Sequence, residues 1–275
     1  MEDDSGHLNS LARACLVSLQ AEAPVRVPRR RQFKLQLPCP AIGNDENRAS
    51  QRNLKLARTT AYHPSLTKQS AKMEVLLGIT GKDFTIIAAS KAAMRGATIL
   101  KASDDKTRSL NKHTLMAFSG EAGDTVQFAE YTQANAQLYS MRNGTDLSPS
   151  ALANFVRGEL ATSLRSRKPY NVNLLLGGVD PITHKPSLYW LDYLASLAKV
   201  PYAAHGYAQY YCLSILDKHH HPDITLHQGI KLLNLCTDEL KRRLPIDFKG
   251  MTVKAVTKDG IIDIEFDDDK VVKMA

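Results

Sequence analysis

The sequence predicts an α+β fold in which two stacked antiparallel sheets carry helices on their outer faces, a four-layer α-β-β-α sandwich. Two observations lead to this class. Strand-like segments and pairs of helix-like segments follow one another in separate runs, which is typical of α+β domains. Segments such as 86–89 and 174–176 are apolar at every position, as expected for strands that are covered on both faces.

The 275 residues divide at Met73 into two regions of different composition. Residues 1–72 hold five of the twelve prolines, and their 12 Lys and Arg against 6 Asp and Glu leave a net charge of +6. In residues 73–275, 24 basic and 22 acidic residues leave only +2. We expect 1–72 to be a poorly ordered basic extension, or not to be translated if Met73 is the true start, and 73–275 to form the domain.

Four strands and two helices are expected first. Aliphatic and β-branched residues dominate the strands, which span Glu74–Thr80, Phe84–Ser90, Ala97–Lys101 and Thr114–Ser119. The first helix should start near Glu121 and end at Asn143-Gly144. Its expected apolar arc comprises Phe128, Tyr131, Ala134, Leu138 and Met141. Ser148 should cap the second helix, with Pro149 in its first position.

Strands, two further helices and a hairpin complete the domain. The strands are expected at Asn171–Gly177, at Ser187–Leu194 and in a short segment ending at Ala204. The helices are expected at Tyr207–Lys218 and Thr225–Leu244, the second with a stripe of Leu226, Ile230, Leu233, Leu240 and Leu244. The final hairpin should run through Met251–Thr257 and Ile261–Phe266, around an Asp259-Gly260 turn.

Composition excludes several functional classes. The four cysteines, at 15, 39, 212 and 236, form no C-x-x-C pair, which indicates reduced thiols in an intracellular compartment. No segment approaches the roughly 18 apolar residues that a membrane helix needs. The positive charge lies mostly in 1–72, so nucleic-acid binding by the domain is not expected. We read His219-His220-His221 as a solvated helix end, because adjacent histidines cannot converge on one metal ion.

Short motifs from Met73 onward carry the chemical information. Lys106 follows Glu74 by 32 residues, Ser119-Gly120 closes a strand, and Asp259-Gly260 forms a turn. This layout, over about 73–266, resembles proteasome beta subunits, which have the N-terminal-nucleophile hydrolase fold. The resemblance implies a catalytic threonine at the position of Glu74, a lysine at Lys106, and an oxyanion-binding glycine at Gly120. It also implies that Ser90 stands at the position of an aspartate that holds this lysine, and that Asp259 belongs to the family's aspartate-glycine turn.

The chain departs from this pattern at the positions of the nucleophile and of the aspartate. A carboxylate at Glu74 cannot act as the combined amine and hydroxyl nucleophile, and Ser90 replaces the aspartate. We therefore expect the fold without catalysis, no catalytic residue, and only degenerate family positions at Glu74, Ser90, Lys106, Gly120 and Asp259. A buried lysine without a partner tends to lose its proton, so we expect Glu74 or another nearby carboxylate to pair with Lys106.

Further details, such as Asp104-Asp105-Lys106 and Ala204-His205-Gly206-Tyr207, look most like the non-catalytic fourth beta position of the eukaryotic 20S core. This resemblance implies a place in a seven-membered ring beside other alpha and beta subunits, in the cytoplasm and nucleus, with no cofactor, nucleic acid or membrane. The alternative is a stand-alone amidohydrolase of the same fold with a different nucleophile, although Ser90 is mid-chain and Cys212 lies on an expected helix.

Overall fold

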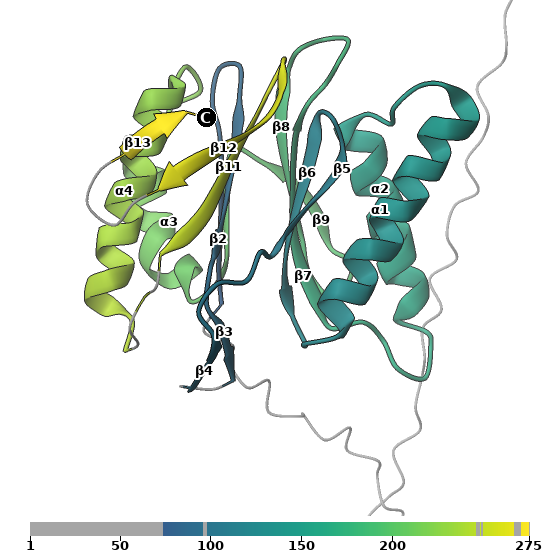
Figure 1. Cartoon of the computed structure of the whole chain (residues 1–275), viewed down its shortest axis with the longest axis horizontal. Helices are drawn as coiled ribbons and strands as arrows, with labels where there is room; N and C mark the ends of the chain where they lie inside the picture. The colour runs from purple at the N-terminus through teal and green to yellow at the C-terminus, as the bar shows by residue number, and fades with distance from the viewer. Residues whose placement is uncertain (1–73, 96–97, 246–247, 249, 267–270, 275) are drawn as a thin grey trace, which may run out of the picture. The chain divides into compact units, whose positions relative to one another are not determined.

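Two antiparallel sheets form the centre of the described part of the chain, and a pair of helices lies against each (Figure 1). The computed structural model describes residues 74–95, 98–245, 248, 250–266 and 271–274. All of them belong to the second of two compact units, Met1–Thr59 and Thr60–Ala275, so the expectations for 1–72 lie outside the described residues. The α+β class with antiparallel sheets is confirmed.

The first sheet has six strands in the order β10-β1-β2-β11-β12-β13. The strands are β1 (Val75–Thr80), β2 (Thr85–Ser90), β10 (Tyr202–Gly206), β11 (Met251–Thr257), β12 (Gly260–Phe266) and β13 (Val271–Met274). β1 and β2 form the expected hairpin, in which Leu76 pairs with Ala89. On the other side of β2, Ser90 pairs with Met251. The start of β1, the end of β2 and the start of β11 therefore share one end of the sheet.

The second sheet has five strands in sequence order. They are β5 (Thr107–Asn111), β6 (Thr114–Gly120), β7 (Val172–Val179), β8 (Pro186–Leu191) and β9 (Leu197–Val200). β3 (Ala93–Arg95) and β4 (Thr98–Lys101) form a separate two-stranded ribbon. β3, β5, β9 and β13 were not predicted, because runs of three to five residues are too short to show a clear alternation.

The four helices begin and end close to their expected positions. They are α1 (Asp124–Asn143), α2 (Pro149–Ser163), α3 (Ala208–His219) and α4 (Leu226–Arg243). The Ser148 hydroxyl accepts the N–H of Ala151 and caps α2, as predicted. Thr225 caps α4 in a reciprocal capping box with Gln228. Gly144 ends α1 in a left-handed conformation, which glycine adopts without strain.

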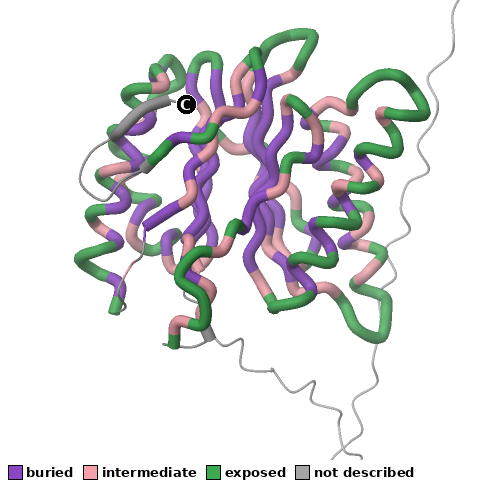
Figure 2. Tube along the Cα trace, viewed as in Figure 1, coloured by how far each residue is buried: buried purple, intermediate pink, exposed green. Residues whose placement is uncertain are grey.

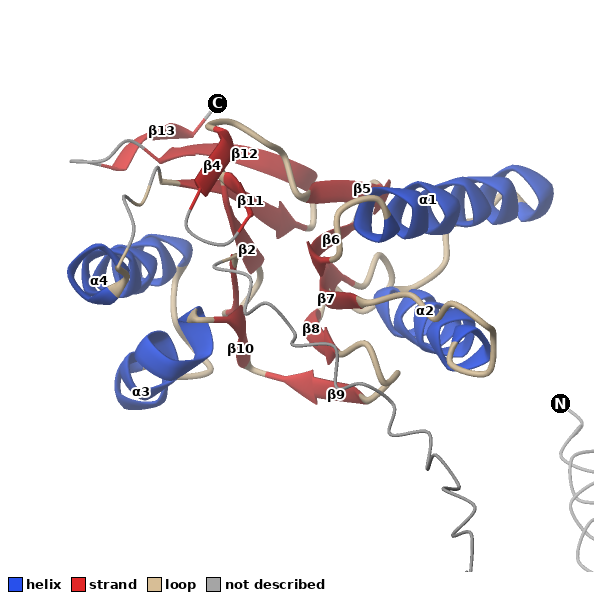
Figure 3. Ribbon diagram, turned by 90° about the horizontal axis from the view of Figure 1, so that it is seen from below, coloured by secondary structure: helices blue, strands red, loops and turns tan. Residues whose placement is uncertain are grey.

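Three clusters of buried apolar residues follow the alternation of side chains along the strands. Figure 2 shows that buried residues run along the strands of both sheets. In β1, Leu77 belongs to a cluster that includes Leu233 of α4. The adjacent Leu76 belongs to a cluster with Leu175 of the other sheet. A third cluster joins the five-stranded sheet to α1 and α2. Figure 3 shows the strands of both sheets between the α1–α2 pair and the α3–α4 pair.

Gly177 of β7 sits where the two sheets touch. A Cβ atom at this position would lie 2.6 Å from Cγ2 of Thr85 and 3.0 Å from Cδ1 of Ile87, both on β2. The absence of a side chain therefore allows β2 and β7 to approach each other.

The buried face of α1 differs from the expected arc. Phe128 is fully buried as predicted, but Tyr131, Leu138 and Met141 are exposed. The other buried residues on this face of α1 include the small residues Ala129, Thr132 and Ala136. The expected arc, which also included the exposed Ala134, was wrong because the spacing of apolar residues along α1 did not show which face of the helix the sheet covers.

Candidate functional site

Four of the five degenerate family positions meet at one end of the two sheets. Glu74 immediately precedes β1, Ser90 ends β2, Lys106 immediately precedes β5, and Gly120 ends β6. Hydrogen bonds connect Lys106 to Ser90 and Gly120 to Glu74. The sequence spacing therefore identified positions that the fold brings together.

Lys106 is 3% exposed, and oxygen atoms surround its ammonium. Nζ donates to the carbonyl oxygen of Ala92 at 2.6 Å, the carbonyl oxygen of Ser90 at 3.0 Å and Ser90 Oγ at 3.3 Å. An ammonium has three N–H donors, so these three acceptors satisfy its charged form. Sequence reasoning missed the Ala92 contact, because a backbone acceptor leaves no signal in residue type.

The expected ion pair of Lys106 is not formed among the described residues, because all three hydrogen-bond acceptors of Nζ are uncharged. Burial lowers the pKa of Lys106, while the negative charges of Glu74 and Asp104 oppose this shift from a longer distance. Lys106 is therefore a buried cation that carboxylates stabilise through space.

Ser90 joins the start of β1 to Lys106. Its Oγ accepts the N–H of Val75 at 3.3 Å in addition to the Lys106 ammonium. A serine next to a lysine can form a catalytic dyad if the amine takes the hydroxyl proton. In this chain Lys106 donates to three acceptors, which leaves the amine no lone pair directed at Ser90. The contact is therefore a structural one.

Glu74 accepts a hydrogen bond from the amide to which the family resemblance assigns the binding of the oxyanion. The N–H of Gly120 donates to Glu74 Oε2 at 3.1 Å. Gly120 has a φ of +145°, and a Cβ atom there would overlap the carbonyl oxygen of Asn171. Only glycine therefore fits this position, and its amide is directed at a carboxylate of the same chain.

The expected role of Asp259 is not supported by its position. Asp259 lies in the turn between β11 and β12, next to the pair Thr257 and Gly260. Ser90 pairs with Met251 at the opposite end of β11. Six residue steps of about 3.3 Å along the strand separate these ends by about 20 Å. The aspartate-glycine spacing matched the family by sequence, but the fold places this turn away from Lys106.

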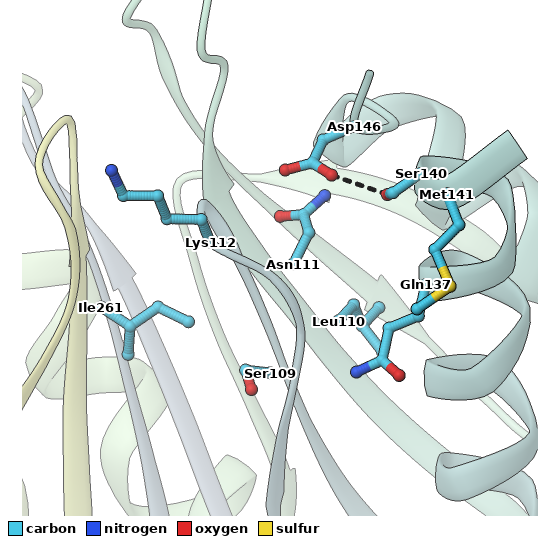
Figure 4. A pocket seen from close by; sticks show the side chains of 9 residues that line it. All are labelled: Ser109, Leu110, Asn111, Lys112, Gln137, Ser140, Met141, Asp146 and Ile261. Atoms are coloured by element: carbon cyan, nitrogen blue, oxygen red, sulfur yellow. Dashed lines mark hydrogen bonds between the residues drawn. The ribbon is translucent and has the colours of Figure 1, made fainter. Parts of the chain in front are cut away.

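One cavity among the described residues lies elsewhere (Figure 4). It has a volume of about 490 Å³, and residues of β5 and its turn, α1 and the following loop, and β12 line it. Within it, Ser140 Oγ donates to Asp146 Oδ1 at 2.6 Å. None of Glu74, Ser90, Lys106 and Gly120 lines this cavity. It is therefore separate from the degenerate site.

Other groups with possible chemistry are structural. His205 is buried, its Nε2 lies 3.0 Å from the carbonyl oxygen of Leu174, and its ring stacks on Trp190. Cys212 and Cys236 are free, buried thiols, and the hydrogen bond with Cys212 together with burial raises the pKa of Cys236. Within the described ranges, no three His, Cys, Asp or Glu side chains are grouped to hold a metal ion.

Among the described residues, no helix is long and apolar enough to cross a membrane.

The two antiparallel sheets bring Lys106 and Gly120 to the start of β1, where Glu74 stands. A family model described as proteasome subunit matches residues 73–256. The chain belongs to the proteasome subunit family.

Three curated relatives are similar to the chain over nearly their whole length. A probable proteasome subunit beta type-4 from Meyerozyma guilliermondii is 60% identical over 190 residues, which are 69% of this chain and 98% of the relative. The proteasome subunit beta type-4 of Saccharomyces cerevisiae is 56% identical over 193 residues, 70% and 98% of the two chains. The probable Schizosaccharomyces pombe counterpart is 55% identical over 192 residues, 70% and 99%.

Proposed function

We infer that this chain is a non-catalytic structural subunit of the 20S proteasome core, at the beta-4 position of a beta ring. It contributes to protein degradation by helping to form the particle in which other beta subunits cut peptide bonds. One observation carries the inference: the position of the nucleophile holds Glu74, and its carboxylate accepts the N–H of Gly120. A carboxylate there supplies neither the amine nor the hydroxyl that the family's acyl transfer requires.

The arrangement of elements supports a four-layer α-β-β-α sandwich. One buried cluster lies between the sheets, and one lies between each sheet and its helices. Apolar side chains also remain on the outer surfaces of the helices. Met141 of α1 is 81% exposed and Tyr210 of α3 is 73% exposed. Single exposed apolar residues are normal on protein surfaces, so the proposed partners, other alpha and beta subunits, rest on the family and on the beta type-4 relatives.

The test is native mass spectrometry of this chain, purified gently from its own cells, combined with N-terminal sequencing. We expect one very large particle with many chains of similar size, and a first residue at or near Met73. A monomer or small homo-oligomer would contradict the structural-subunit role. Sequencing also tests the proposed domain boundary at residue 73. Fractionation would test the proposed location in cytoplasm and nucleus.

The alternative is a stand-alone amidohydrolase, and the 3.3 Å contact between Ser90 and Lys106 is the one observation that favours it. Ser90 is buried within the chain, and Lys106 also donates to two carbonyl oxygens. A mechanism-based acylating probe separates the two functions. We expect no label on this chain in the intact particle, while a label that is lost in Ser90→Ala would favour the enzyme.

A further inference from the structure

We propose that the degenerate centre is an internal anion site, for which the Glu74 carboxylate is the resident ligand, held by the Gly120 amide near the positive charge of the buried Lys106 ammonium. The ligand class of the site is a small carboxylate. This inference deepens the non-catalytic role: the group that replaces the nucleophile also occupies the amide that would otherwise face a reacting carbonyl oxygen.

The positive side of the site is built from buried groups. Lys106 is 97% buried, and its direct partners, the oxygens of Ser90 and Ala92, are neutral. These oxygens fix the position of the ammonium without cancelling its charge. A buried charge costs free energy unless an opposite charge is near, so the site favours an anion. Glu74 is the first of the two carboxylates that stabilise this ammonium through space, followed by Asp104.

The geometry at Gly120 makes Glu74 the better placed of the two anions. Its Oε2 accepts the Gly120 N–H at 3.1 Å, and the next residue, Val75, is fixed by the hydrogen bond from its N–H to Ser90 Oγ. Asp104 instead accepts from Lys101 at 3.2 Å, in an exposed pair outside this site. Glu74 thus accepts the N–H of Gly120 directly, and its negative charge favours the charged form of Lys106.

Hydrogen exchange measured by mass spectrometry tests the site in the assembled full chain. In Glu74→Ala, the loss of a charge-assisted hydrogen bond should accelerate exchange of the Gly120 amide by roughly tenfold. Sodium formate, a free carboxylate, should restore the slower exchange, whereas sodium chloride at equal ionic strength should not. Glu74→Gln keeps an oxygen acceptor without the charge, and should give an intermediate rate that formate changes little.

The matched control is Glu121→Ala, which removes an exposed carboxylate next to Gly120. It should exchange like the parent and show no response to formate. Parent-like exchange in Glu74→Ala, or equal effects of formate and chloride, would overturn the proposal. If Glu74→Ala does not enter the particle, the nearly isosteric Glu74→Gln provides the test. Parent-like exchange of the Gly120 amide and of the segment around Lys106 in Glu74→Gln would then refute the anion-site proposal. Incorporation, measured separately by native mass spectrometry, reports on the structural role and not on the anion site.

Discussion

His205 should make the stability of the domain depend on pH. The side chain is 5% exposed, and its ring stacks on Trp190 at a centroid distance of 5.0 Å. Because a carbonyl oxygen only accepts, Nε2 carries a hydrogen that it donates to Leu174. Burial lowers the pKa of His205 from 6.5 to about 4, although the carbonyl groups of Leu174 and Leu191 and the charge of Asp192 oppose the shift.

The sign of the effect follows from proton binding. The folded pKa of His205 lies below the unfolded one, so the unfolded chain binds more protons between these values. The contribution is fully present above about pH 6.5, and it is lost as the pH falls toward 4. The shift limits the total loss to about 3 kcal/mol, of which about 2 kcal/mol falls between pH 7 and pH 5.

The perturbation is His205→Phe, which keeps an aromatic ring against Trp190 but cannot take up a proton. At pH 7 the variant should lose about 1 kcal/mol with the hydrogen bond to Leu174. Between pH 7 and pH 5 it should lose about 2 kcal/mol less than the parent. Denaturant unfolding can be followed by fluorescence, since Trp190 is the only tryptophan of the chain. The exposed Gln127→Ala removes no titratable group, serves as control and should keep the parent's pH slope. If the free energy of unfolding falls equally with pH in His205→Phe and in the parent, His205 does not cause the pH dependence.

Three further substitutions test local features by urea unfolding. Gly177→Ala places a methyl group against Thr85 between the sheets and should cost about 1–3 kcal/mol; a parent-like free energy of unfolding would show that the sheets can separate freely. Thr225→Ala removes the hydroxyl that accepts the N–H of Gln228, and should cost about 1 kcal/mol, while Thr225→Ser should cost little. His184 has a φ of +54°, so His184→Gly should stabilise the domain by roughly 1 kcal/mol, and a loss of stability would contradict the inferred strain.

Local features of this protein could be predicted from residue type and spacing alone. Helix ends could be predicted at Ser148 and Gly144, because a capping side chain and a left-handed glycine act within a few residues. The first hairpin followed from two apolar runs around Gly81. The family resemblance also identified Lys106 and Gly120 as positions near the start of the first strand.

Features that depend on segments far apart in the sequence could not be predicted and are seen only in the folded chain. The buried face of α1 depends on which face of the helix the sheet covers, so small residues such as Ala129 are buried while Met141 is exposed. Strand direction and length place Asp259 at the far end of β11 from Ser90, although a spacing in sequence cannot show which end of a sheet a turn occupies. The partners of Lys106 are mainly backbone oxygens, which every residue carries, so the folded chain alone selects them.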